Sequence, residues 1–219
     1  MVAVAPIAAI SEPRVILDHV RWATYELLLA DYIDSHAVRF AFDQGVLEIV
    51  SPLPKHERDA LALARLTETV AKDLDPDYLP VGFTTFRSPL LQKGFEADAS
   101  FYFQHAAAFR PRDEFDAASD PPPELVIEVE VSHRSLDKLP IYAAMGVPAV
   151  WRCTGDKVTI LALAGGAYRE TDRSLVLPLL GSDILSRVLV ESRTLPRLTW
   201  VRMVRTWAPE QQMSHKPTR

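Results

Sequence analysis

The sequence has little cysteine and no long apolar run. Cys153 is the only cysteine, which excludes an intramolecular disulfide and gives no sign of an oxidising compartment. No apolar stretch approaches the roughly 20 residues that a transmembrane helix needs. The N-terminal stretch MVAVAPIAAI is apolar, but it lacks a basic region and Pro6 interrupts it, so it does not resemble a signal peptide. We therefore expect a cytoplasmic protein with no membrane partner.

The sequence also lacks an excess of positive charge. Its formal net charge of -5 argues against a protein that coats nucleic acid, because the phosphate backbone favours clustered Lys and Arg. The stretch 187–205 is an exception, because it holds five arginines and Glu191 is its only acid. This stretch is either a phosphate-facing surface or a solvated helix face.

Length and pattern indicate one domain. The 219 residues, 48% hydrophobic, suffice for a single core. We expect a flexible arm over 1–22, one folded domain over 23–208 and a disordered tail over 209–219. The expected helices are 24–35, 55–73, 137–145, 184–190 and 200–207, and the expected strands are 39–43, 46–50, 81–87, 97–103, 125–131, 149–153 and 157–164. This order indicates an α/β or α+β fold with a mixed central sheet flanked by helices.

Acidic residues interrupt two of the expected strands. Glu128 and Glu130 alternate along 125–131, so they share one face of a strand that is otherwise strongly apolar. Two like charges inside a sheet are costly unless a cation lies near them, and the alternative is an edge strand with one wet face. Asp98 lies at the start of another strand. If the two strands pair, Asp98 and Glu128 converge, and their hard oxygen ligands suit Mg²⁺ or Mn²⁺.

Lys138 lies at the start of the next expected helix, where the helix dipole disfavours a cation. A lysine that reaches back to the carboxylates would explain this position, and an exposed surface lysine is the alternative. Other candidate motifs are weak. His56 and Glu57 lack the second histidine of a zinc-protease helix, and Cys153 has no obvious activating partner.

Three blocks of the sequence resemble one family. These blocks are FDQGVLEIVSPLPKHE, TTFRSPLLQKGFEADASFYF and PPPELVIEVEVSHRSLDKLPIYAAMGVPAVWR. Together they are similar to the Uma-type restriction endonucleases, a bacterial family of the PD-(D/E)XK nuclease superfamily, from about Ala23 to Arg193. The resemblance implies a restriction-endonuclease-like fold and a single magnesium-dependent active site.

The resemblance also implies roles for individual residues. Asp98 matches the aspartate of the family's proline–aspartate pair, although Ala97 replaces the proline, and Glu128 matches the acid of the following strand. Glu130 stands where the superfamily lysine would be, and Lys138 is similar to a lysine relocated to the next helix. His56 and Glu57 look like a helix motif of the family, to which we assign no role.

These observations predict a metal-dependent endonuclease that acts on nucleic acid, with DNA the expected substrate and a homodimer the expected assembly. Asp98 and Glu128 would bind Mg²⁺ or Mn²⁺, and Glu130 would be an outer ligand or would orient the attacking water. Lys138 would hold that water or the scissile phosphate. Two alternatives remain: an inactive nuclease-fold module that binds nucleic acid or a protein, and a hydrolase of a small phosphorylated molecule.

Overall fold

The computed structural model describes residues 12–35, 37–74, 77–130 and 136–214. The helices are α1 (Trp22–Asp31), α2 (Pro54–Leu74), α3 (Ala106–Phe109), α4 (Leu139–Ala144), α5 (Ser182–Thr194) and α6 (Arg197–Ser214). The strands are β1 (Arg14–Leu17), β2 (Arg39–Asp43), β3 (Val46–Val50), β4 (Leu79–Pro80), β5 (Thr85–Ser88), β6 (Lys93–Glu96), β7 (Ala99–Tyr102), β8 (Leu125–Glu130), β9 (Ala149–Thr154), β10 (Lys157–Ala164) and β11 (Ala167–Thr171).

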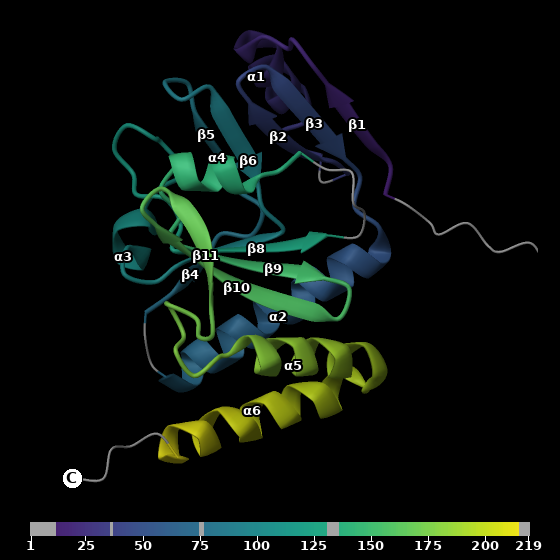
Figure 1. Cartoon of the computed structure of the whole chain (residues 1–219), viewed down its shortest axis with the longest axis vertical. Coiled ribbons are helices and arrows are strands. Elements are labelled where there is room, and N and C mark those ends of the chain that lie inside the picture. The colour runs from purple at the N-terminus through teal and green to yellow at the C-terminus, as the bar shows by residue number, and fades with distance from the viewer. Residues whose placement is uncertain (1–11, 36, 75–76, 131–135, 215–219) are drawn as a thin grey trace, which may run out of the picture.

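The larger sheet has the strand order β11-β10-β9-β8-β7-β4, and it is mixed because β8 and β9 run parallel while their neighbours are antiparallel. Alternate residues of β8 serve two cores. Ile127 packs with Trp151 and Leu66 on the face covered by α2 and α5, whereas Val126 packs with Ile141 of α4 on the other face. Figure 1 shows α5 and α6 along one side of this sheet and α4 on the opposite side.

A second, smaller sheet is antiparallel and has the order β1-β3-β2-β6-β5. Its β2–β3 hairpin turns at Gln44 and at Gly45, where a φ of +101° suits glycine. Tyr25 of α1 stacks on Phe42 of this hairpin, with ring centroids 5.0 Å apart. The hydroxyl of Tyr25 lies where a Cβ at Gly94 of β6 would stand, so glycine is required at that position for close packing.

The expected mixed α+β fold with flanking helices is confirmed, but its division into two sheets was not expected. The strand predicted over 81–87 is wrong. In its place β4 belongs to the larger sheet and β5 to the smaller one, separated by a turn in which Thr84 N–H donates to the Val81 carbonyl. The strand predicted over 97–103 begins only at Ala99, because the chain crosses from β6 of one sheet to β7 of the other at Ala97 and Asp98.

The structure has a strand and part of a helix within the ranges expected to be the arm and the tail. Strand β1 lies within the expected arm and pairs with β3 from Arg14↔Val50 to Leu17↔Leu47, because its backbone completes the edge of the smaller sheet. Residues 1–11 of that arm lie outside the described residues. Helix α6 continues to Ser214, and the single domain over 23–208 stays a prediction. In the part of the chain that is described, no helix is long and apolar enough to cross a membrane.

Candidate active site

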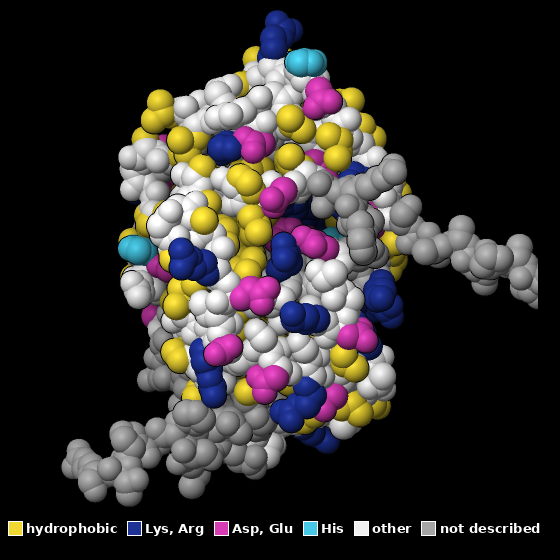
Figure 2. Space-filling view, viewed as in Figure 1, with side chains coloured by type: hydrophobic (Ala, Val, Ile, Leu, Met, Phe, Trp, Pro, Cys, Tyr) yellow, Lys and Arg dark blue, Asp and Glu magenta, His cyan; other side chains and the backbone are white. Residues whose placement is uncertain are grey.

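The two carboxylate-bearing segments meet as the alternation of side chains predicted. Strands β7 and β8 pair antiparallel with Ala99 opposite Ile127, so Asp98 comes next to Glu128. The Asp98 Oδ2 atom accepts a hydrogen bond of 2.7 Å from the Val129 N–H of β8. Both carboxylates line a cavity of about 30 Å³, which is room for roughly two water molecules. Figure 2 shows a hollow in this face of the molecule, with acidic, basic and histidine side chains around it.

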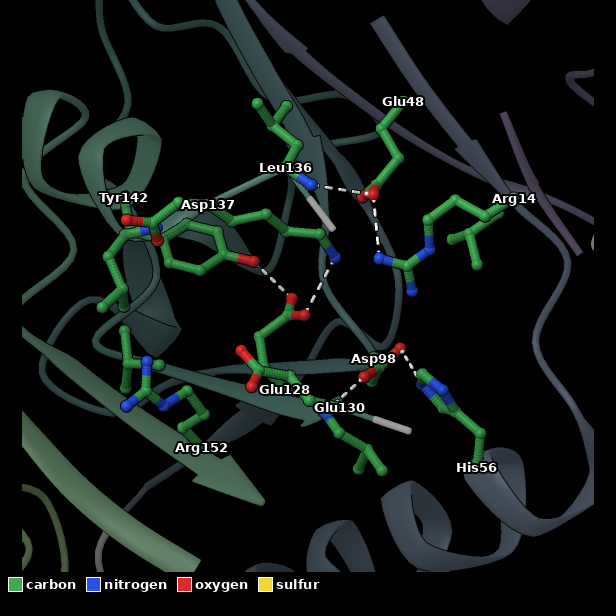
Figure 3. A pocket seen from close by; sticks show the side chains of 15 residues that line it. Arg14, Glu48, His56, Asp98, Glu128, Glu130, Leu136, Asp137, Tyr142 and Arg152 are labelled. Carbon is green, nitrogen blue, oxygen red and sulfur yellow. Dashed lines mark hydrogen bonds and ion pairs between the residues drawn. The ribbon is translucent and has the colours of Figure 1, made fainter. Parts of the chain in front are cut away.

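Glu128 points toward Tyr142 (Figure 3), and it has a second donor in Lys138. The Lys138 Nζ atom lies 2.9 Å from Oε2, and the Tyr142 hydroxyl donates to Oε1. Burial and the nearby charge of Asp98 raise the pKa of Glu128 to about 7, although Lys138 and Tyr142 oppose this shift. Burial lowers the pKa of Lys138, but Glu128 and Asp98 outweigh it and hold that pKa above its ordinary value. Lys138 is therefore charged at neutral pH.

Asp98 is held on its other oxygen by His56, near the start of α2. The His56 Nε2 atom forms an ion pair of 2.8 Å with Asp98 Oδ1. Burial alone would raise the pKa of Asp98, but His56 and Lys138 lower it below its ordinary value. Burial likewise opposes a charge on His56, yet Asp98 and Glu12 raise its pKa to about 10. The imidazole is therefore protonated, and its partner is an ionised carboxylate.

The remaining predicted residues divide between the cavity and the surface. Glu130 lines the cavity, but its side chain points away from Asp98 toward Arg152 in Figure 3, and the Thr154 hydroxyl donates to it at 3.3 Å. The helix expected over 137–145 begins only at Leu139. Lys138 therefore lies immediately before α4 and not within its first turn. Glu57, next to His56, pairs instead with Arg39 at 3.3 Å.

Several residues that line the cavity or contact its acids were not predicted. Tyr142 and Arg152 line it from α4 and β9, and Arg14 and Glu48 line it from the smaller sheet. Arg152 lies opposite Glu128 in the parallel pairing of β8 with β9. Tyr142 lies four residues after Lys138. Residues at this spacing share one face of a helix, so the spacing could have identified Tyr142.

The arginine-rich stretch 187–205 does not face this cavity. It belongs to α5 and α6, and α5 covers the Ile127 face of the larger sheet, whereas Glu128 points to the opposite face. Arg193 is engaged in structure, because it forms ion pairs with Asp59 at 2.8 Å and Asp156 at 2.5 Å. This stretch therefore does not supply phosphate contacts at the carboxylates.

The carboxylates around the cavity are oxygen ligands of the kind that a hard divalent cation prefers, but they do not form a complete set of ligands. In the described part of the chain, no group of three or more His, Cys, Asp or Glu side chains is arranged to hold a metal ion. Mg²⁺ usually takes only one or two carboxylates and keeps several waters. Three of the four oxygens of Asp98 and Glu128 accept one hydrogen bond from the protein, and the fourth forms the ion pair with His56. A carboxylate oxygen has a second lone pair. The donor set therefore permits a metal held by these two carboxylates and water.

The protein is thus an α+β domain in which paired strands bring two carboxylates to one cavity and a lysine before α4 reaches the same cavity. The chain belongs to the Uma2 family, described as "Putative restriction endonuclease", whose model matches residues 22–194. The resemblance drawn from the three sequence blocks is thereby confirmed. A crystal structure of a putative nuclease from Anabaena variabilis ATCC 29413 shares 14% identity, covers 68% of this chain and 90% of its own, and gives a TM-score of 0.47. No curated protein sequence matches the chain.

Proposed function

We propose that this protein is a divalent-metal-dependent endonuclease that hydrolyses phosphodiester bonds of nucleic acid, with DNA as its substrate. The observation that supports this most directly is the convergence of Asp98, Glu128 and Lys138 on one cavity. Family membership supports the reaction class. The proposed assembly is a homodimer, because a protein with one site per chain needs two sites to cut both strands of a duplex.

Asp98 and Glu128 would hold Mg²⁺ or Mn²⁺, which supplies charge to polarise the phosphate and lower the pKa of a bound water. Lys138 does not act as a base, because its pKa is raised and it keeps its proton at neutral pH. Its ammonium instead offers a point charge to a phosphate oxygen or to the attacking water. Glu130, at the side of the cavity, would orient that water or accept from a water on the metal.

The direct test is calorimetric titration of wild type and Asp98→Asn with Mn²⁺, together with a cleavage assay on duplex DNA, single-stranded DNA and RNA with metal or chelator. We expect Asp98→Asn to lose metal binding and cleavage. Glu170→Gln is the matched control, because Glu170 is exposed on β11 and does not line the cavity. Equal metal affinity in wild type and Asp98→Asn would remove Asp98 from the site.

One observation favours a second candidate, an inactive nuclease-fold module that binds nucleic acid or a protein partner. Lys138 pairs with Glu128 and His56 pairs with Asp98, so each of the two carboxylates already has a cation from the chain itself. This candidate predicts nucleic-acid binding that is the same with Mg²⁺ and with chelator, and no cleavage with either. The endonuclease predicts cleavage that disappears when chelator is added.

A further inference from the structure

Two acids outside the proposed chemistry are buried next to the site. Glu12 is 4% exposed and Glu48 is 1% exposed. A buried carboxylate without partners costs several kcal/mol, so each must be compensated by donors. Their contacts form two series of hydrogen bonds and ion pairs, which we call paths. One path leads to Asp98 and the other toward Lys138, and both begin in the segment that precedes α1.

The first path runs from Glu12 through His56. The Glu12 Oε1 atom lies 2.5 Å from His56 Nδ1 and also accepts from the Leu53 N–H at 3.3 Å. The opposite nitrogen of the same ring forms the 2.8 Å ion pair with Asp98. Because the two ring nitrogens face two different carboxylates, Glu12 holds the His56 ring in place against Asp98.

The second path runs from Arg14 through Glu48. The Arg14 Nη1 atom donates to Glu48 Oε1 at 2.9 Å, and Nη2 donates to Glu12 Oε2 at 3.3 Å. The same Glu48 oxygen accepts from the Leu136 N–H at 3.0 Å. Leu136 stands two residues before Lys138, so Glu48 fixes the backbone from which Lys138 reaches Glu128. Figure 3 shows this run of contacts from Arg14 through Glu48 to Leu136.

We propose that Glu12 and Arg14 are positioning residues of the active site, Glu12 for Asp98 and Arg14 for Lys138. The inference rests on the proposed function, in which Asp98 holds the metal and Lys138 holds the water or the phosphate. It makes β1 and the two residues before it part of the catalytic apparatus. Strand β1 is the edge strand of the smaller sheet and pairs only with β3 among the described strands. Glu12 and Arg14 are therefore held to the sheet through one neighbouring strand.

The two paths predict different defects. Glu12→Ala should weaken Mn²⁺ binding about tenfold, in the range usual for loss of an outer carboxylate, and Glu12→Gln should recover part of it because its amide oxygen still accepts from Nδ1. Arg14→Met should keep Mn²⁺ affinity within about twofold and lower kcat about tenfold, with partial recovery in Arg14→Lys. Amide exchange at Leu136 should speed up in Arg14→Met and stay unchanged in Glu12→Gln.

Asp18→Asn and Arg21→Met are matched controls, because both residues are exposed in the same segment and neither lines the cavity. Urea unfolding checks that every variant is folded at the assay temperature. Wild-type Mn²⁺ affinity and kcat in Glu12→Ala and Arg14→Met would overturn the positioning roles and leave the endonuclease proposal standing. A wild type that binds Mn²⁺ but cuts nothing would defeat the endonuclease proposal, while reduced affinity in Glu12→Ala would still support the path through His56.

Discussion

Replacing Lys138 with methionine should weaken metal binding at neutral pH as well as cleavage. The Lys138 ammonium lies 2.9 Å from Glu128, whose pKa is about 7 while that cation is present. Loss of an opposite charge this close raises a carboxyl pKa by roughly one to three units. The ionised fraction of Glu128 at pH 7 would then fall from about one half to between roughly one tenth and one thousandth. Metal affinity should fall about 5-fold to 500-fold, which corresponds to about 1 to 4 kcal/mol.

The assay is calorimetric titration with Mn²⁺ at pH 6.5, 7.5 and 8.5. Wild-type affinity should rise through pH 7 and then level off, because Glu128 completes its ionisation there. The affinity of Lys138→Met should start lower and continue to rise by nearly tenfold per unit up to pH 8.5. Lys138→Arg should keep the wild-type profile, since the charge remains, but cut about a hundredfold more slowly, since a planar fork does not replace a point charge.

Lys72→Met is the control, because Lys72 is an exposed lysine of α2 and does not line the cavity. The refuting result is a Lys138→Met protein with the same affinity and the same pH profile as wild type. That outcome would mean that Lys138 does not set the charge of Glu128. An unchanged cleavage rate as well would mean that the ammonium has no part in the reaction.

Three further substitutions and one measurement of mass test the fold and the site. His56 has a pKa of about 10 in the folded protein against an ordinary 6.5, so the stability that its charge contributes is fully present below about pH 6.5 and is lost as the pH rises through 10. The difference in unfolding free energy between wild type and His56→Asn, measured in urea, should therefore shrink across that interval. Gly94→Ala should cost roughly 1–3 kcal/mol of unfolding free energy, because the new Cβ meets the Tyr25 hydroxyl. Tyr142→Phe removes a hydrogen bond that lowers the pKa of Glu128, so Mn²⁺ affinity at pH 7 should fall and recover at pH 8.5. Light scattering at micromolar concentration should give the mass of a dimer, and a monomer mass would count against that assembly.

Local patterns predicted the elements that are locally determined. The β2–β3 hairpin occurs over the predicted residues because its turn and its alternation lie within twelve consecutive positions. The division into two sheets could not be predicted in this way. Strands of both sheets have the same two-residue alternation, so a pattern that continues through Ala97 and Asp98 looks like one strand, although the chain passes there from one sheet to the other.

The same distinction applies to the site. The approach of Asp98 to Glu128 was predictable, because Glu128 interrupts an apolar strand, Asp98 directly precedes another, and one pairing of the two strands brings them together. Arg14 and Glu48 were not predictable. Arg14 lies 34 positions from its partner Glu48, and Glu48 lies 88 positions from the amide it accepts from, so nothing near either residue shows that it is buried.

The charges around the cavity give a physical reason why it should attract a cation. Four acids (Glu12, Glu48, Asp98 and Glu128) are connected to three cations (Arg14, His56 and Lys138). When all of these groups are ionised, the acids outnumber the cations by one. Burial first, and the charge of Asp98 next, raise the pKa of Glu128 to about 7 although Lys138 is paired with it, so this carboxylate is about half protonated at pH 7. A divalent ion would compete with that proton for the same carboxylate. Proton release on metal binding at pH 7 is therefore a direct consequence of this arrangement, and a titration in two buffers of different ionisation enthalpy would measure it. If no proton is released, the metal binds somewhere other than Glu128.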